Sequence, residues 1–289
     1  MTKKKKEFNP ALLIVNAMNF LVKIVPGLVG RIAFYLFCHP KKKKVKPAER
    51  NFLATADLIE AEVDGRQYAV YHWGFRGPIA LLAHGWESQS GRWRKTVPVL
   101  LKAGYQVIAV DAPGHGRSDG GRFTMIEYAG IIRFLLQKYA PVELVVGHSV
   151  GASSVGWALG TIGDGLHPRK VILMAPFSTL RYTIDKSRKA LGISDAVMQA
   201  MELRMKKLFN LTPDDIDLPA KVQALGHVDV LIIHDKHDNV TNWTESVKIH
   251  EAWPGSRLVI TETFGHGLTS PEVYEMIGDY AKRTLNLSI

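Results

Sequence analysis

The chain has 289 residues, 46% hydrophobic and 22% charged, which is the composition of a globular protein with a sizeable core. Its single cysteine, Cys38, excludes an intrachain disulfide. The net charge of +10 lies in residues 1–50, which hold 12 Lys and Arg against 2 Asp and Glu. Residues 51–289 hold 25 basic (Lys and Arg) and 25 acidic (Asp and Glu) residues, and this balance of charge argues against a nucleic-acid partner.

An apolar stretch, residues 10–37, fills most of the N-terminal arm and lies between two lysine clusters, Lys3–Lys6 and Lys41–Lys44. It is too long for a signal peptide, and no small-residue cleavage site follows it. Its length suits a transmembrane helix, but two basic residues and Pro26 interrupt it. A helix that lies in the membrane plane fits better.

Helical spacing gathers the polar and small residues of this stretch on one narrow stripe, which leaves a wide apolar face. The stripe consists of Asn16, Asn19, Lys23, Gly27, Gly30 and Arg31. We expect an amphipathic helix in the interface of an anionic membrane, with basic side chains of residues 3–44 on the headgroups. The alternative is that the apolar face packs on the protein's own body or on a partner.

From Leu58 onward, short apolar runs alternate with helical patterns. The predicted strands are Leu58–Val63, Gln67–His72, Ile79–Ala83, Gln106–Val110, Glu143–Val146, Lys170–Met174, Val228–Ile233 and Arg257–Thr261. The predicted helices include Met125–Lys138, Ala152–Leu159, Thr244–Trp253 and Val273–Leu285. This alternation predicts a mainly parallel sheet within one domain, residues 51–289, and the Asp64-Gly65 turn predicts an antiparallel hairpin at its start.

An insertion without a clear strand, at about 175–227, interrupts this rhythm. Within it, Asp195–Asn210 has a helical pattern that gathers methionines on one face. That face packs on the domain, or it forms a helical cap over an active site. In a cap, the adaptable side chains of Met201 and Met205 would contact an acyl chain of the substrate.

A nucleophile motif, Gly147-His148-Ser149-Val150-Gly151, stands between a predicted strand and a predicted helix. G-x-S-x-G is short enough to occur by chance. Here, however, it has the preceding strand and the following helix that a nucleophile turn requires. The glycines permit a tight turn, on which a strained Ser149 projects at the start of the helix. Ser149 is therefore the candidate nucleophile.

A serine nucleophile needs a base, and the base needs an orienting acid. His266 follows the last predicted strand and is the candidate base. Asp238 follows the preceding strand and is the candidate acid, with Asp235, nearer the strand end, as the alternative. The chain order Ser149, Asp238, His266 is the one found in hydrolases with this nucleophile motif.

His84-Gly85-Trp86, after another predicted strand, supplies the remaining element. Its turn directs the N–H of Trp86 toward the developing oxyanion, together with the N–H of Val150. Two other histidines, His234 and His237, resemble a metal-binding pair, but no third ligand accompanies them, so we expect no metal site.

The motifs resemble the α/β-hydrolase superfamily over residues 58–289, and within it the monoacylglycerol lipase and lysophospholipase group. Residues 84–93 are similar to that group's H-G-x-x-E-x-S-G-R-aromatic segment, and residues 111–120 to its D-x-x-G-H-G-x-S-x-G turn. The resemblance implies an α/β-hydrolase fold with helices on both faces of a mainly parallel sheet. It also implies a Ser149, Asp238 and His266 triad with Trp86 and Val150 as oxyanion hole. The chain departs from the pattern after Gly151, where Ala152 replaces a frequent second glycine.

Together these residues predict a cytoplasmic, membrane-associated serine hydrolase that cleaves carboxylic esters and needs no cofactor. The apolar arm and the methionine face favour lipid-derived or medium-chain acyl esters. A serine nucleophile argues against epoxide hydrolases and dehalogenases of the superfamily, which use an aspartate. The alternatives are a thioesterase or small-peptide amidase, and a non-catalytic membrane-bound binding protein on the same fold.

Overall fold

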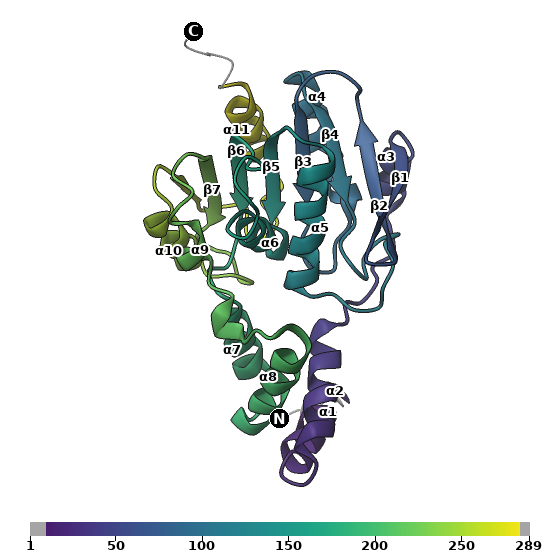
Figure 1. Cartoon of the computed structure of the whole chain (residues 1–289), viewed down its shortest axis with the longest axis vertical. Coiled ribbons are helices and arrows are strands. Elements are labelled where there is room, and N and C mark those ends of the chain that lie inside the picture. The colour runs from purple at the N-terminus through teal and green to yellow at the C-terminus, as the bar shows by residue number, and fades with distance from the viewer. Residues whose placement is uncertain (1–9, 284–289) are drawn as a thin grey trace, which may run out of the picture. The chain divides into compact units, whose positions relative to one another are not determined.

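Two compact units make up the protein in a computed structural model that describes residues 10–283 (Figure 1). The helical unit joins the chain up to Cys38 with Thr179–Ile216, and the sheet unit joins His39–Ser178 with the chain from Asp217 onward. The arm that the sequence predicts as a separate segment therefore shares a unit with most of the predicted cap insertion.

One eight-stranded sheet forms the centre of the sheet unit, in the order β1-β2-β4-β3-β5-β6-β7-β8. The strands are β1 Asp57–Val63, β2 Arg66–Trp73, β3 Ile79–Ala83, β4 Gln106–Val110, β5 Val142–His148, β6 Lys170–Met174, β7 Asp229–Asp235 and β8 Arg257–Thr261. β1 and β2 form the predicted antiparallel hairpin, β2 pairs antiparallel with β4, and all other neighbours are parallel. The prediction of a mainly parallel sheet is confirmed.

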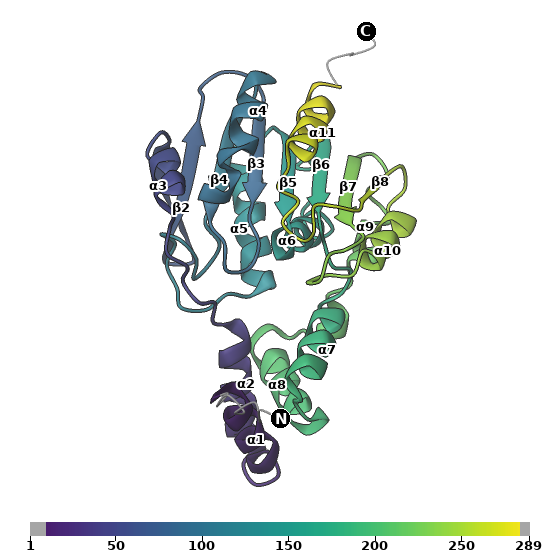
Figure 2. The same ribbon diagram turned by 180° about the vertical axis from the view of Figure 1, so that it is seen from behind.

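Helices cover both faces of this sheet. They are α3 Pro47–Leu53, α4 Thr96–Lys102, α5 Met125–Lys138, α6 Val150–Leu159, α9 Leu218–Val222, α10 Thr244–Ala252 and α11 Pro271–Lys282, with a short 3-10 helix, η1, at Ser90–Arg94. α5 packs beside α6 on the face toward the viewer in Figure 1, and α4 packs beside α11 on the face toward the viewer in Figure 2.

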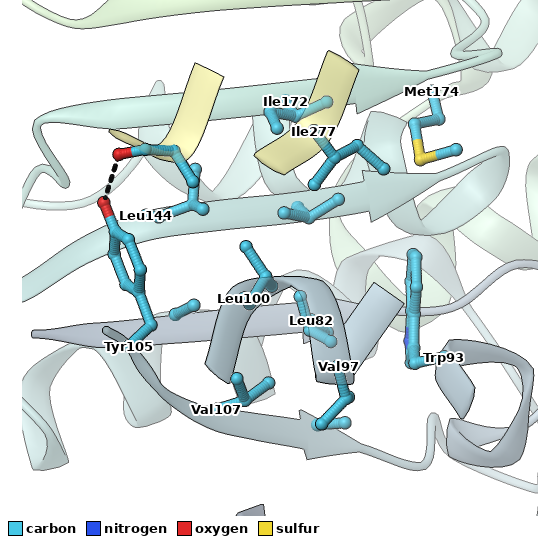
Figure 3. Packing of buried hydrophobic residues seen from close by; sticks show 14 of the residues in the cluster. Leu82, Trp93, Val97, Leu100, Tyr105, Val107, Leu144, Ile172, Met174 and Ile277 are labelled. Atoms are coloured by element: carbon cyan, nitrogen blue, oxygen red, sulfur yellow. Dashed lines mark hydrogen bonds between the residues drawn. The ribbon is translucent and has the colours of Figure 1, made fainter. Parts of the chain in front are cut away.

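The core between the sheet and the α4–α11 pair consists of buried hydrophobic residues (Figure 3). Because alternate strand residues point to the same face, Leu82 of β3 packs here with Leu100 of α4 and Ile277 of α11. The Tyr105 hydroxyl donates to the carbonyl of Ala281 at 3.0 Å and ties the end of α11 to the start of β4. This core holds the parallel strands in place. The segments that follow their carboxyl ends therefore lie close together at one edge of the sheet.

Four helices form the helical unit: α1 Pro10–Leu21, α2 Pro26–Cys38, α7 Leu180–Leu191 and α8 Asp195–Phe209, followed by the short 3-10 helix η2, Pro213–Asp215. α2 crosses α8 closely, because a Cβ atom on Gly30 would lie 2.2 Å from the carbonyl oxygen of Ala200. The rings of Phe34 and Phe209 pack 6.3 Å apart along the same contact. Only glycine permits this approach of the two backbones.

The arm differs from the predicted single helix, because α1 ends at Leu21 and Pro26 begins α2. Proline suits the first turn of a helix and breaks its interior. Asn19 and Gly30, two members of the predicted polar stripe, make internal contacts. The Asn19 side chain donates to Gly192 O at 2.9 Å and accepts from Ser194 N at 2.8 Å, which fixes the α7–α8 turn. Among residues 10–283, no helix has the length and apolarity to cross a membrane.

Candidate active site

Ser149 occupies the tight turn between β5 and α6. Its φ of 55° and ψ of −127° are strained for a residue with a side chain, and its N–H donates to Met174 O at 2.8 Å. A Cβ on Gly147 would lie 2.5 Å from Ala152 Cα, and a Cβ on Gly151 would lie 2.3 Å from His84 O. Both glycines are therefore required by close backbone approaches, and the turn holds Ser149 at the edge where β5 ends.

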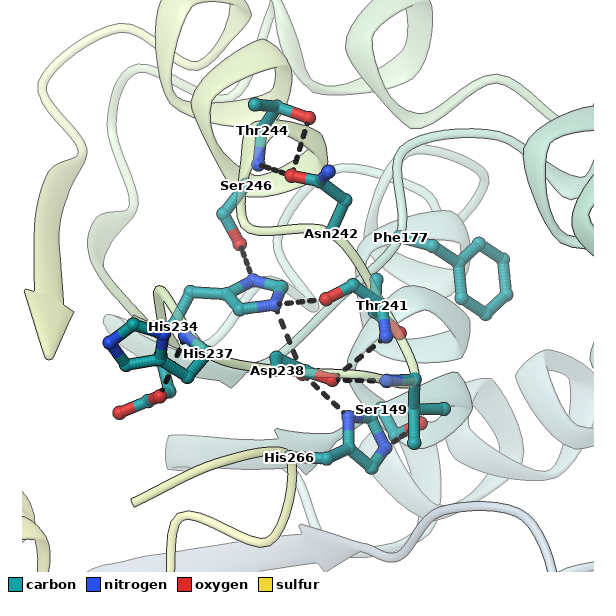
Figure 4. A network of polar contacts seen from close by, with 12 residues as sticks. Ser149, Phe177, His234, His237, Asp238, Thr241, Asn242, Thr244, Ser246 and His266 are labelled. Atoms are coloured by element: carbon teal, nitrogen blue, oxygen red, sulfur yellow. Dashed lines mark hydrogen bonds and ion pairs between the residues drawn. The ribbon is translucent and has the colours of Figure 1, made fainter. Parts of the chain in front are cut away.

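The structure brings Ser149, His266 and Asp238 into one hydrogen-bonded chain (Figure 4). His266 Nε2 lies 3.0 Å from Ser149 Oγ, and His266 Nδ1 lies 2.7 Å from Asp238 Oδ2. Because a carboxylate only accepts, Nδ1 carries the hydrogen and Nε2 is left to accept from the serine hydroxyl. This is the geometry in which a histidine removes a serine proton.

The side chain of Asp238 is fully buried. Its Oδ1 accepts from Val240 N at 2.7 Å and from Thr241 N at 2.8 Å. Burial raises the pKa of Asp238, but hydrogen bonds from His234, His266 and the Thr241 amide outweigh it, so the pKa lies well below its ordinary value. The acid therefore stays ionised beside the imidazole.

Asp235, the alternative acid, is bound elsewhere. Its Oδ2 accepts from Thr261 Oγ1 at 2.7 Å and from Phe264 N at 2.8 Å, while its Oδ1 accepts from His237 N at 2.9 Å. It connects the end of β7 to the segment that follows β8 and so helps to place the His266 loop. Asp238, and not Asp235, is the carboxylate bonded to His266.

His234 makes a second imidazole contact with Asp238, one that the sequence analysis did not anticipate. Its Nε2 lies 3.1 Å from Asp238 Oδ2 and 3.1 Å from Thr241 O, so Nε2 carries a hydrogen. Its Nδ1 then accepts from Ser246 Oγ at 2.6 Å. The only signal of this contact in the sequence is a histidine four residues before the candidate acid, and that histidine also resembles one member of a metal-binding pair. Within residues 10–283, no group of three or more His, Cys, Asp or Glu side chains could hold a metal ion.

The His84-Gly85-Trp86 turn lies against the nucleophile. A Cβ on Gly85 would be 3.1 Å from Ser149 Cβ. Ala112 N donates to His84 Nε2 at 2.9 Å, so His84 Nδ1 donates to Gly85 O at 2.8 Å. Because the peptide unit is planar and trans, fixing this carbonyl also fixes the opposed N–H of Trp86. The Trp86 ring is held edge-on by Phe123, with centroids 5.4 Å apart.

The loop that carries His266 is held by two donors. His148 Nε2 lies 2.8 Å from the carbonyl oxygen of His266, and Arg92 Nη2 donates to Gly267 O at 3.1 Å. Burial lowers the pKa of His148 well below its ordinary value, so the ring is neutral. His148 belongs to the nucleophile motif, and Arg92 belongs to the segment at residues 84–93 that contains the oxyanion turn. These two segments therefore hold the loop that carries His266 in place.

Val150 begins α6, so its N–H belongs to the helix N-terminus behind Ser149. Met201 and Met205 lie on α8, in the other compact unit, and both side chains are buried. The roles predicted for Val150, Trp86 and these methionines stay predictions.

A search of protein families matches residues 80–273 to the Alpha/beta hydrolase family. The chain is 37% identical over 98 residues to epoxide hydrolase B of Mycobacterium tuberculosis, covering 32% of this chain and 26% of that protein. It is 35% identical over 119 residues to the bifunctional esterase/perhydrolase DCH of Acinetobacter calcoaceticus, covering 39% and 42%. The matched region thus spans less than half the length of these two curated relatives.

Solved structures of esterases are similar over most of the chain. The Pyrococcus furiosus esterase Pf2001 has a TM-score of 0.63 and 18% identity, covering 85% of this chain and 98% of that one. An esterase from Exiguobacterium antarcticum has a TM-score of 0.59 and 23% identity, covering 78% and 99%. At these identities the likeness shows the fold alone, and the fold class predicted from the sequence is confirmed.

Proposed function

Because this chain belongs to the alpha/beta hydrolase family, we propose that it is a serine hydrolase that cleaves carboxylic esters. The observation that carries the proposal is the contact of His266 with both Ser149 and Asp238, at 3.0 Å and 2.7 Å. A serine hydroxyl becomes a useful nucleophile when a base with this geometry removes its proton. The bifunctional esterase/perhydrolase among the relatives supports the same activity.

The proposed reaction is acyl transfer to water. His266 Nε2 takes the proton of Ser149 as Oγ attacks the ester carbonyl carbon, and the N–H groups of Trp86 and Val150 stabilise the oxyanion. His266 then donates the proton to the departing alcohol, which leaves an acyl-enzyme. Water attacks this acyl group with His266 again as base, and the carboxylic acid departs from Ser149.

We propose lipid-derived or medium-chain acyl esters as substrates, in line with the resemblance to the monoacylglycerol lipase group. Contact of Met201 and Met205 with the acyl chain is part of this proposal, and substituting them should shift the preferred chain length. The proposed location is the cytoplasm, at a membrane surface. A single cysteine, which forms no intrachain disulfide, fits a reducing compartment.

Two other functions use the same scaffold. A thioesterase or small-peptide amidase would use the same three residues on another bond. A non-catalytic membrane-bound binding protein would keep the fold without turnover. The epoxide hydrolase among the relatives adds no third candidate, because Ser149 stands where those enzymes have an aspartate.

Hydrolysis of nitrophenyl esters of increasing acyl length, by wild type and Ser149→Ala, tests the proposal. We expect turnover with an optimum at medium or long chains, and no turnover by Ser149→Ala. Matched thioesters and amides measured alongside separate the alternative enzymes. Equal rates for both proteins, or turnover of thioesters or amides alone, would refute ester hydrolysis as the function.

A further inference from the structure

One side of the α1–α2 pair is buried inside the helical unit. The buried residues of this segment include Val15, Met18, Val22, Val29, Gly30 and Ala33. Gly30 lies against the backbone of α8, and Asn19 is bonded to the α7–α8 turn. The arm is thus an integral part of a folded unit, and the opposite side of both helices faces outward.

The outward side is apolar instead of polar. We define the outer face as Leu13, Phe20 and Leu21 of α1 with Leu28, Ile32 and Leu36 of α2. Phe20 is 65% exposed and Leu28 is 54% exposed. Leu13 and Phe20 are seven residues apart, and the three α2 residues are spaced by four, so each set follows one side of its helix.

The exposure is concentrated in this part of the chain. Among the described residues, 19 large hydrophobic side chains are exposed, and 11 of them lie between Leu12 and Leu36. The other eight are scattered over the rest of the chain, as is ordinary for a protein surface. A concentration of exposed apolar side chains of this kind marks a surface that binds a partner or a membrane.

Charge identifies the kind of partner. The outer face is bordered by the exposed basic side chains of Lys23 and Arg31, and Lys41–Lys44, also exposed, follow α2 after two residues. The first fifty residues hold 12 Lys and Arg against 2 Asp and Glu. A second copy of the chain would bring the same positive charge to the interface. An anionic lipid surface satisfies both the apolar face and the basic border.

The basic segment also lies beside the candidate active site. Lys41 N donates to Glu87 Oε1 at 3.2 Å, and Lys43 Nζ lies 3.8 Å from Glu87 Oε2. Glu87 follows Trp86, whose turn packs against Ser149. Headgroups bound by Lys41–Lys44 would therefore lie next to the loop that borders the nucleophile.

Helix length determines how the face meets the bilayer. α1 has 12 residues and α2 has 13, so each is about 20 Å long, whereas a hydrocarbon core is about 30 Å thick. We propose that the outer face of α1 and α2 binds an anionic bilayer, with both helices lying in the plane of one leaflet. This inference is independent of the proposed ester hydrolysis, because binding needs no turnover.

Flotation of the full-length protein with lipid vesicles tests the proposal. Wild type should float with vesicles of phosphatidylcholine and phosphatidylserine and bind much less to phosphatidylcholine alone. Deleting the arm is a poor test, because it would uncover the buried side of α8. Point variants on the outer face leave that packing intact.

The double variant Phe20→Glu, Leu28→Glu is the informative one, and Phe75→Glu is the control for a glutamate at an exposed phenylalanine outside the outer face. Phe20 is 65% exposed and Phe75 is 74% exposed. Phe75 belongs to the sheet unit and not to the arm. We expect Phe20→Glu with Leu28→Glu to lower vesicle binding by about 10-fold or more, and Phe75→Glu to leave it unchanged. Circular dichroism of each variant checks that the helices remain folded.

Three outcomes would overturn the proposal. One is failure of wild type to float with anionic vesicles. Another is equal binding by wild type and the Phe20→Glu, Leu28→Glu variant. The third is a lipid-free dimer that this variant converts to a monomer, which would assign the outer face to a second copy of the chain. Loss of ester hydrolysis in Ser149→Ala without loss of flotation keeps the two proposals separate.

Discussion

His234 and His266 bond to the same oxygen of one carboxylate, Asp238 Oδ2, at 3.1 Å and 2.7 Å. His234 is itself held by Ser246, so the hydrogen-bonded chain runs from Ser246 through His234, Asp238 and His266 to Ser149 (Figure 4). His234 therefore positions the acid. It does not touch the nucleophile.

His234→Leu should lower kcat/KM about 10-fold, because Asp238 loses a donor to its charged form, an interaction of about 1.5–3 kcal/mol. His234→Gln keeps an N–H donor and should recover much of the activity. Steady-state kinetics of both variants check this, with urea unfolding to separate stability from rate. Equal activity in the two variants would show that packing, and not hydrogen bonding, is what His234 supplies.

Asp238→Asn and Asp235→Asn form a matched pair of substitutions at positions three residues apart in the loop after β7. Asp238→Asn should lower kcat about 10⁴-fold, because an amide neither stabilises the imidazolium nor keeps the correct tautomer. Asp235→Asn should mainly lower the free energy of unfolding, by about 1–3 kcal/mol, since its three backbone and side-chain bonds are weakened. Comparing kcat and urea unfolding for both checks the assignment. The reverse order of kcat losses would make Asp235 the acid.

Stability should fall in mild acid because two histidines are buried in neutral form. Burial lowers the pKa of His84 and of His148 in the folded protein below the ordinary value of about 6.5. The unfolded chain then binds more protons below about pH 6.5, so the unfolding free energy decreases as pH falls, by up to about 1.4 kcal/mol per pH unit for each histidine.

Urea unfolding should show the protein less stable at about pH 5 than at about pH 7.5, because burial lowers the pKa of both histidines in the folded protein. His148→Gln, which cannot titrate, should reduce this slope. Asp238 acts at lower pH: its depressed pKa gives stability above about pH 3.9 that is lost as pH falls through the folded-state pKa. A flat profile between about pH 5 and 7.5 would contradict the neutral assignment of the histidines.

Gly30→Ala should loosen the helical unit, whereas Gly27→Ala should not. A Cβ on Gly30 meets Ala200 O at 2.2 Å, while a Cβ on Gly27 has no atom within 4 Å. The first change forces α2 away from α8 at a cost of about 1–3 kcal/mol. Amide hydrogen exchange should accelerate in α1, α2 and α8 for Gly30→Ala only. Unchanged protection in both variants would mean that the helix contact is not close.

Much of the sheet was predictable from the sequence because its signals are local. All eight predicted strands are present, since continuous apolar runs such as Lys170–Met174 suit strands covered on both faces. Helix Met125–Lys138 has the predicted bounds. Its N-terminus is predictable from the sequence because Thr124 is a favourable N-cap residue. The candidate triad followed from motif order, because each member comes after a parallel strand.

What the sequence did not reveal depends on contacts between distant segments. Asn19 and Gly30 look like a polar stripe by periodicity, yet they contact a turn and a helix about 170 residues away. The second imidazole on Asp238 has no local signal either, because only the fold of the loop after β7 turns His234 toward that carboxylate. Periodicity predicts which residues share one face of a helix, but it does not predict which distant segments pack against that face.

Covalent labelling by a fluorophosphonate, followed by intact-mass analysis, tests the central claim most directly. The account predicts one adduct on wild type at Ser149, no adduct on Ser149→Ala, and labelling of His266→Ala slower by about 10³-fold or more. An unlabelled wild type, or full-rate labelling of Ser149→Ala, would contradict it.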